Sequence, residues 1–293
     1  EPNYRTLHIK PIPAGCGIVF SMVYVLSILY LWVFNGLAVS LFLVFSVGGL
    51  AASFFGFLDD LINISATKKL LVQFLLSCWA FFWLEASYFN YFDLIPSILS
   101  IPATIFFLVW VINAYNFLDG IDGMAISGSV FILSTIICVL ILTSPESKYI
   151  TLLALLLASS IPFLFFNWPS ATIFMGDAGS IFFGYLFGSI IIATIMSGDL
   201  SVWTWLIVFG YYLTDLVVTQ IMRIILVKKW YLAHRSHAYQ NLARIKGSHL
   251  LVTGGVVVFN IVWILPLTLW SAIYPEMSYY AIILALIPGM IFA

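Results

Sequence analysis

Charged residues are scarce in this sequence. Only 8% of its 293 residues are Asp, Glu, Lys or Arg, whereas 63% are hydrophobic and the mean hydropathy is +1.13. A soluble domain carries roughly 25% charged residues. The composition therefore excludes an ordinary soluble protein and indicates one that crosses a membrane many times. We expect membrane lipid to surround it, and we expect no nucleic acid partner.

Cysteine chemistry and the common nucleotide motifs are lacking as well. The three cysteines, Cys16, Cys78 and Cys138, are far apart in apolar sequence and show neither metal-ligand spacing nor a disulfide framework. The chain contains no P-loop and no GxSxG sequence, so neither an ATPase of that type nor a serine hydrolase is indicated.

Long apolar runs fill most of the chain. A bilayer core takes about 20 apolar residues as a helix. We therefore predict an all-α polytopic membrane protein, a single domain over 1–293, with about ten spans. The ten predicted spans are 17–35, 38–58, 69–88, 98–117, 123–143, 149–167, 179–197, 201–224, 250–273 and 277–293.

Lys and Arg gather on one side of these spans. Ten of the eleven fall on the connections 1–16, 59–68, 118–122, 168–178 and 225–249 or on adjoining span ends, and the other side holds only Lys148. Because short cytoplasmic loops carry the excess of Lys and Arg, we predict that this side is cytoplasmic. The basic loop 225–249 is the longest polar segment, and a short amphipathic or re-entrant helix is expected in it between Lys228 and Tyr239.

The segment NAYNFLDGIDGMA (113–125) lies between two predicted spans. It contains Asn113, Asn116, Asp119 and Asp122. Ionisable residues at a membrane boundary are costly, and by default they indicate a functional site. We therefore expect this segment to contact a ligand.

Two adjacent carboxylates, Asp59 and Asp60, end the predicted span 38–58. They repel each other, and a helix C-terminus is itself partly negative. A cation or a basic ligand would compensate them, which favours a functional pair. The alternative is a solvated helix end close to Lys68 and Lys69.

Two further polar groups lie on the same side. Asp177 sits between glycines just before a predicted span, with Asn167 nearby; the alternative for Asp177 is a helix cap. His234, Arg235 and His237 form a patch in the loop 225–249 that suits phosphate. A loop that merely follows the positive-inside rule would explain the arginine but not the histidines.

Together these groups indicate a type of chemistry. Carboxylate and amide oxygens suit Mg²⁺, which usually binds through one or two carboxylates plus substrate phosphates. An Arg and His patch opposite them suits a diphosphate. The residues alone therefore predict Mg²⁺-assisted phosphoryl transfer in a cleft at the cytoplasmic surface of the membrane, between a soluble phosphorylated substrate and a lipid.

At this point the motifs are recognisable. In order, PNYRTLHIKPIPAGCG, GFLDD, NAYNFLDGIDGMA, FNWPSATIFMGDAGS and HRSHAYQ resemble those of the polyprenyl-phosphate N-acetylhexosamine-1-phosphate transferases (glycosyltransferase family 4). This family includes the peptidoglycan translocase and the initiating transferases of O-antigen. The loop HRSHAYQ looks like the O-antigen branch.

The resemblance implies a reaction in a bacterial inner membrane. A UDP-amino sugar gives its sugar-1-phosphate to undecaprenyl phosphate and releases UMP, with Mg²⁺ (or Mn²⁺) as cofactor. It also implies an additional N-terminal span, eleven in all, and a possible homodimer.

The resemblance also implies roles for particular residues. Asp59 and Asp60 would be catalytic, either as a base that deprotonates the lipid phosphate or as a covalent nucleophile. Asp177 and Asn116 would bind the metal. The residues expected to bind the nucleotide or substrate are Asn113, Asp119, Asp122, Asn167, His234, Arg235 and His237.

Two other functions are compatible with acids in a membrane protein. A transporter or ion-coupled carrier would also place carboxylates in the membrane, but here they gather at one face rather than at the midplane. A scaffold that kept the fold without catalysis would not need all of the motif acids, and all of them are present.

Overall fold

The structure is a computed structural model that describes residues 12–84, 97–226 and 236–292. These residues form helices and contain no strand. Several of the helices are long and apolar enough to cross a bilayer. The predicted all-α polytopic membrane fold is confirmed.

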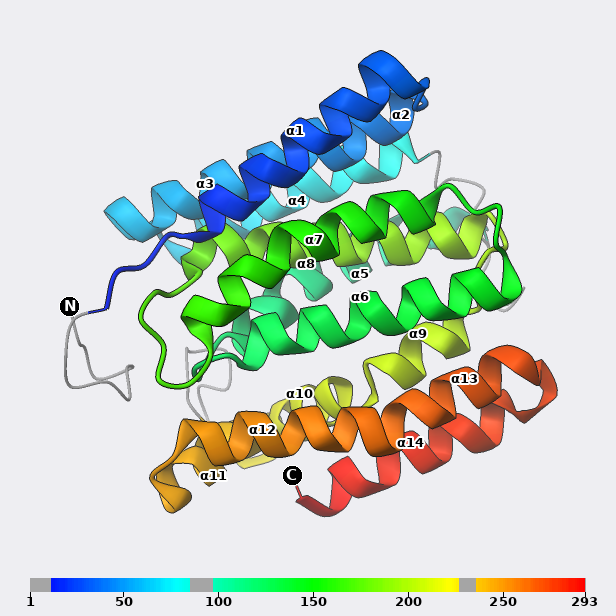
Figure 1. The fold of residues 1–293 in the computed structure, drawn as a ribbon. Helices are drawn as coiled ribbons and strands as arrows, with labels where there is room; N and C mark the ends of the chain where they lie inside the picture. The colour runs from blue at the N-terminus through cyan, green and yellow to red at the C-terminus, as the bar shows by residue number, and fades with distance from the viewer. Residues whose placement is uncertain (1–11, 85–96, 227–235, 293) are drawn as a thin grey trace.

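The helices run side by side, roughly parallel or antiparallel (Figure 1). Most coincide with the apolar runs of the sequence. In chain order they are α1 (Gly17–Asn35), α2 (Val39–Phe42), α3 (Gly49–Ile62), α4 (Ala66–Trp83), α5 (Ser97–Leu118), α6 (Met124–Thr143), α7 (Tyr149–Asn167), α8 (Gly176–Met196), α9 (Val202–Val208), α10 (Gly210–Leu226), α11 (Ala238–Lys246), α12 (His249–Phe259), α13 (Leu265–Ile273) and α14 (Ser278–Phe292). Short π-helical stretches join α2 to α3 (Leu43–Gly48) and α12 to α13 (Asn260–Ile264), and a 3₁₀ turn, Pro275–Met277, precedes α14.

Helix α8 is the centre of the bundle. Every residue from Ala178 to Thr194 is buried, so the helix is apolar on all sides, as an enclosed helix must be. Glycines let two neighbours approach its first turn: a Cβ at Gly17 of α1 would overlap the backbone of Gly179, and one at Gly56 of α3 would overlap the carbonyl of Asp177. The end of α3 is thereby held against the start of α8.

Among the described residues, fewer helices qualify as membrane spans than the ten that the sequence predicts. Within the described ranges, seven helices are long and apolar enough to cross a membrane, or eight if the bent pair α9 and α10 forms one span. The other two predicted spans correspond to α4, whose first turns carry Lys68 and Lys69, and to α14, which has 15 residues. Both predicted spans run into residues outside the described ranges, so the count of ten stays a prediction.

Two local predictions need correction. Helix α8 begins at Gly176, so Asp177 lies in its first turn rather than before it. The predicted span 201–224 is bent by 77° between α9 and α10. The segment expected to hold a short helix between Lys228 and Tyr239 lies mostly outside the described residues, and the helix that the structure describes in this loop, α11, begins only at Ala238.

The connections predicted to share one face do meet at one end of the bundle. The turns between α3 and α4, between α5 and α6 and between α7 and α8 lie there, together with α11 (Figure 1). Contacts between them are given below. Which side of the membrane this end faces stays a prediction.

Candidate active site

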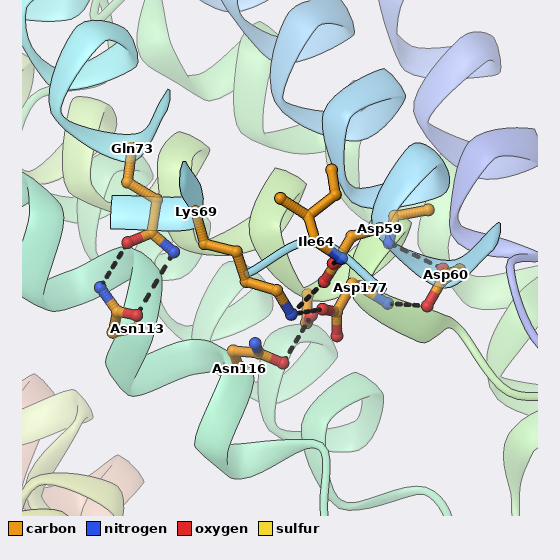
Figure 2. Close-up of polar contacts among 10 residues, drawn as sticks. Asp59, Asp60, Ile64, Lys69, Gln73, Asn113, Asn116 and Asp177 are labelled. Atoms are coloured by element: carbon orange, nitrogen blue, oxygen red, sulfur yellow. Dashed lines mark hydrogen bonds and ion pairs between the residues drawn. The ribbon is translucent and has the colours of Figure 1, made fainter. Parts of the chain in front are cut away.

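A lysine joins two of the predicted carboxylates. The Lys69 ammonium forms an ion pair with Asp59 and another, at 3.1 Å, with Asp177 Oδ2. The Asp59 side chain is 2% exposed, whereas those of Asp177 and Lys69 are 25% and 30% exposed. Figure 2 shows the ammonium pointing between the two carboxylates. We call Asp59, Asp60, Lys69 and Asp177 the carboxylate cluster.

The end of α3 orients Asp59. The helix stops at Asn63, which has a positive φ of 50°. This turn brings the amide of Ile64 back to the last helical turn, where it donates a 2.7 Å hydrogen bond to Asp59 Oδ1. One carboxylate oxygen is thereby fixed by the backbone, and the other faces Lys69.

Asp60 caps the central helix. Its carboxylate accepts hydrogen bonds from the amides of Asp177 (2.9 Å) and Ala178 (3.2 Å), in the first turn of α8. An anion at a helix N-terminus satisfies amides without partners in the helix and lies at the positive end of the dipole. A side chain at Gly176 would collide with this carboxylate. Asp60 thus fixes the start of α8 and is nevertheless exposed at the surface.

The two asparagines of α5 have different partners. Asn116 accepts a 3.1 Å hydrogen bond from Ser180, on the first turns of α8, and its amide points toward the carboxylate cluster (Figure 2). Asn113 is held by Gln73 through a pair of hydrogen bonds of 2.7 and 3.3 Å. Asn113 is thus engaged by α4, which weakens its predicted role as a substrate contact.

Asp119 completes the acidic surroundings of the site. Burial and repulsion from Asp60 and Asp122 raise the pKa of its carboxyl to about 7. Within the described ranges it accepts no hydrogen bond. A carboxyl whose pKa lies near 7 and that accepts no hydrogen bond from the described residues is a candidate for contact with a ligand.

Asp122 and Asn167 have structural partners instead. Asp122 is buried; one carboxylate oxygen accepts from the amide of Ala171 at 3.0 Å, and the other lies 3.2 Å from His249 Nδ1. Asn167, 1% exposed, accepts from Gly123 N and donates to the carbonyl of Ile173. These bonds tie the turn before α6 to the segment before α8. Their predicted role in binding substrate stays a prediction.

The histidine loop is only partly described. His234 and Arg235 lie outside the described residues. His237, just before α11, is buried with its Nδ1 3.1 Å from Asp215 Oδ2. Helix α11 is docked on α5 by the Tyr239 hydroxyl, which donates a 2.5 Å hydrogen bond to the carbonyl of Phe117. His237 therefore lies against the end of α5, where its ring packs on that of Phe117, two residues before Asp119 in the sequence.

Lys69 and Gln73 were not predicted as site residues. They lie four residues apart on α4 and contact the predicted acids and amides from one helix face. Lys69 was attributed to the positive-inside pattern. Gln73 is a polar residue in an apolar run, and that signal could have found it.

The oxygens of this site suit a magnesium ion that is also held by a substrate. Among the described residues, no three His, Cys, Asp or Glu side chains are placed to hold a metal by themselves. Asp59 and Asp177 nevertheless share one cation, Lys69, and the Asn116 amide lies beside them. Two carboxylates and an amide match the partial ligand set that Mg²⁺ takes beside phosphates, so the residues fit this metal.

An apolar cavity of about 100 Å³ lies where α9 bends into α10, against α5 and α8. It is lined by hydrophobic side chains, among them Tyr115 and Leu118, which flank Asn116 and Asp119 in the sequence. A cavity of this character suits hydrocarbon rather than a polar ligand.

Comparisons with known proteins agree with these features. The model of glycosyl transferase family 4 matches residues 42–195. A probable undecaprenyl-phosphate N-acetylglucosaminyl 1-phosphate transferase of Bacillus subtilis is 27% identical over 290 residues, covering 94% of this chain and 79% of the relative. A phospho-N-acetylmuramoyl-pentapeptide-transferase of Petrotoga mobilis is 35% identical over 196 residues, covering 61% of this chain and 59% of the relative. One of Clostridioides difficile is 32% identical over 170 residues, covering 50% and 52%.

Proposed function

We propose a function from one premise: the chain belongs to glycosyl transferase family 4, whose model matches residues 42–195. The proposed reaction moves a sugar-1-phosphate of the N-acetylhexosamine type from a UDP-sugar to undecaprenyl phosphate. A phosphate oxygen of the lipid forms a bond to the β-phosphorus of the donor, the bond between that phosphorus and the bridging oxygen breaks, and UMP leaves.

The observation that carries this proposal is the position of Lys69 between Asp59 and Asp177. Transfer between two phosphates brings several negative charges together, and catalysis depends on positioning and charge neutralisation. In such a site the Lys69 ammonium can bind a phosphate, and a neighbouring carboxylate can accept a proton.

Within the cluster the residues take different roles. Asp60 is the exposed residue of the α3 pair. We propose that its carboxylate accepts the proton of the lipid phosphate. Asp59 is buried and holds Lys69 in place. Asp119 and His237 face the nucleotide and the sugar diphosphate.

Mg²⁺ is the proposed cofactor, with Mn²⁺ as a substitute. Asp177 and Asn116 would hold it together with donor phosphate oxygens, and when bound it would neutralise charge on the diphosphate. The support is the chemistry of the donor set: oxygen atoms only, and fewer than a closed metal site requires.

The acceptor lipid is assigned to the apolar cavity between α5, α8, α9 and α10. At about 100 Å³, the cavity has room for only a small part of a long isoprenoid chain. The support for this assignment is that two lining residues, Tyr115 and Leu118, directly precede Asn116 and Asp119 in the sequence. The phosphate would then reach the carboxylate cluster while the remaining chain lies in the bilayer.

The proposed setting is the cytoplasmic face of a bacterial inner membrane, at the start of a lipid-linked surface glycan such as O-antigen. The relatives act on N-acetylglucosamine or phospho-N-acetylmuramoyl-pentapeptide according to their names, so an N-acetylhexosamine donor is the proposed class. A homodimer stays a prediction.

A transporter is the second function considered. Carriers hold their polar residues near the middle of the membrane, whereas the acids of the proposed site belong to the end of α3, the turn after α5 and the start of α8, segments that lie at one end of the bundle (Figure 1). The family match favours the transferase as well.

The test is UMP release from a panel of UDP-amino sugars. Purified protein is incubated with undecaprenyl phosphate, Mg²⁺ and each donor in turn, and UMP is measured. We expect release with at least one UDP-N-acetylhexosamine and none without the lipid. A folded, full-length protein that releases no UMP with any donor would refute the proposal.

A further inference from the structure

A buried carboxylate behind His237 has not been given a role so far. Asp215 lies in α10, and its side chain and that of His237 are 4% and 3% exposed. A buried carboxylate is costly unless its oxygens are satisfied. Here each oxygen has one partner: Oδ2 lies 3.1 Å from His237 Nδ1, and Oδ1 accepts a 2.7 Å hydrogen bond from the amide of Ala238.

The two bonds act on one short element. Ala238 is the first residue of α11, and His237, at its N-cap position, supplies no cap from its own side chain. Asp215 provides this cap from another helix and lies at the positive end of the helix dipole. A single side chain thus fixes both the start of α11 and the imidazole in front of it.

The imidazole is also fixed by its neighbours. The rings of Phe117 and Tyr239 lie with their centroids 5.9 and 5.8 Å from that of His237, and the Tyr239 ring is stacked on it. Tyr239 is itself bound to the carbonyl of Phe117. The ring plane is therefore set by packing, and Asp215 selects which nitrogen points in which direction.

The hydrogen bond decides the tautomer. A carboxylate accepts only, so Nδ1 carries the proton on the Asp215 side. Any contact of His237 with a phosphate must then go through Nε2, at the far side of the ring. A carboxylate that orients a histidine in this way fixes its tautomer and supports its positive charge.

We propose that Asp215 is a positioning residue that keeps Nδ1–H of His237 directed at its own carboxylate and supports the imidazolium when the donor is bound, so that Nε2–H donates to the diphosphate of the UDP-sugar. This inference rests on the proposed function for its substrate. Asp215 does not touch the donor and acts through His237 alone.

The first test is a tautomer measurement. In protein with ¹⁵N-labelled histidine, the wild type shows the Nδ1-protonated pattern for His237. In Asp215→Asn the amide donates to Nδ1 and reverses the pattern. An unchanged pattern in that variant would overturn the inference, and the measurement does not depend on turnover.

The second test is a double-mutant cycle in the KM for UDP-N-acetylglucosamine. We expect Asp215→Asn to raise KM roughly ten- to a hundredfold, the size of a lost hydrogen bond to a charged group. Asp215→Glu should recover part of the loss. In a His237→Ala background, Asp215→Asn should change KM no further, because both substitutions remove one interaction. Additive effects would contradict action through His237.

Two controls distinguish a specific effect of Asp215 on donor binding from a general effect of the substitution or a failure to fold. Asp199→Asn makes the same chemical change in the segment after α8, at the end away from Asp177, and should leave KM unchanged. Should Asp215→Asn not fold, His237→Gln is compared with His237→Asn: the glutamine amide reaches toward the Nε2 position and should retain more donor affinity. The reverse order would overturn the inference.

The two proposals fail differently. If the wild type releases no UMP with any donor, the proposed function fails. If it does release UMP and Asp215→Asn has an unchanged KM, only the positioning role fails.

Discussion

The carboxylate cluster and the surroundings of Asp122 differ in how their charges are satisfied. In the cluster, one ammonium is shared by Asp59 and Asp177, and Asp177 and Lys69 remain partly exposed. Asp122 is buried, one of its carboxylate oxygens accepts from the amide of Ala171, and the other lies 3.2 Å from His249 Nδ1, which itself accepts from the amide of Asp122. Both regions are acidic sequences beside a predicted span, yet only the first has charges that a ligand could rearrange.

This difference shows how to divide the acids of such a site. A buried acid whose partners are a backbone amide and a histidine, as in Asp122, stabilises the fold. An acid that shares a partly exposed cation with a second acid can exchange that cation for a metal or a phosphate. Position in a motif does not separate the two cases, because Asp119 and Asp122 belong to one segment.

The largest expected effect is the loss of turnover in Asp177→Asn. Asp177→Asn removes one charge beside Lys69 and the proposed metal, and should lower turnover roughly a hundred- to a thousandfold with little change in thermal unfolding. Asp122→Asn should instead lower the free energy of unfolding by about 1–3 kcal/mol, because a buried hydrogen bond is disturbed, and leave turnover within a few-fold. UMP release measures turnover, and thermal unfolding in detergent measures stability. If Asp122→Asn lost turnover and Asp177→Asn lost only stability, the distinction between catalytic and structural acids would be refuted.

The second prediction concerns Lys69. In Lys69→Met the two carboxylates lose their shared cation, so Mn²⁺ should bind more tightly in the absence of donor, while turnover falls roughly tenfold or more. Electron paramagnetic resonance measures the Mn²⁺ affinity. Lys68→Met is the matched control, because this neighbouring lysine is exposed. Weaker Mn²⁺ binding in Lys69→Met would show that the ammonium does not compete for the site.

The third prediction is a pH dependence of stability at Asp119. Its folded-state pKa is raised from an ordinary value near 3.8 to about 7, so ionising it disfavours the folded state. This cost is absent below about pH 4, grows as the pH rises, and is complete above about pH 7. Asp119→Asn should therefore become more stable relative to the wild type as pH rises through that window. Thermal unfolding of both proteins at several pH values measures the difference, and a constant difference would contradict the raised pKa.

Much of the fold could be predicted because the bilayer requires long apolar helices. The predicted spans 17–35 and 149–167 coincide with α1 and α7. The bend between α9 and α10 and the early start of α8 could not be predicted. The start of α8 depends on a partner distant in sequence, the Asp60 carboxylate that accepts from its first amides.

The site was predicted in part for a similar reason. Asp59, Asp177 and Asn116 were found because polar groups are rare in this chain and stand out. Lys69 and Asp215 were missed as members of the site, since a lysine near a span end and an acid within a span acquire their roles only through contacts across helices. Asn167 was expected to bind substrate, but it has backbone partners that no spacing rule reveals.

The most direct test of the central claim follows the phosphorus atoms. A UDP-N-acetylhexosamine labelled with ³²P only in its β-phosphate is incubated with the protein, undecaprenyl phosphate and Mg²⁺. If the chain transfers sugar-1-phosphate, the label will be recovered in the lipid and unlabelled UMP will be released, and Asp177→Asn will show neither. Label that stays with the nucleotide as UDP, while sugar enters the lipid, would contradict the account.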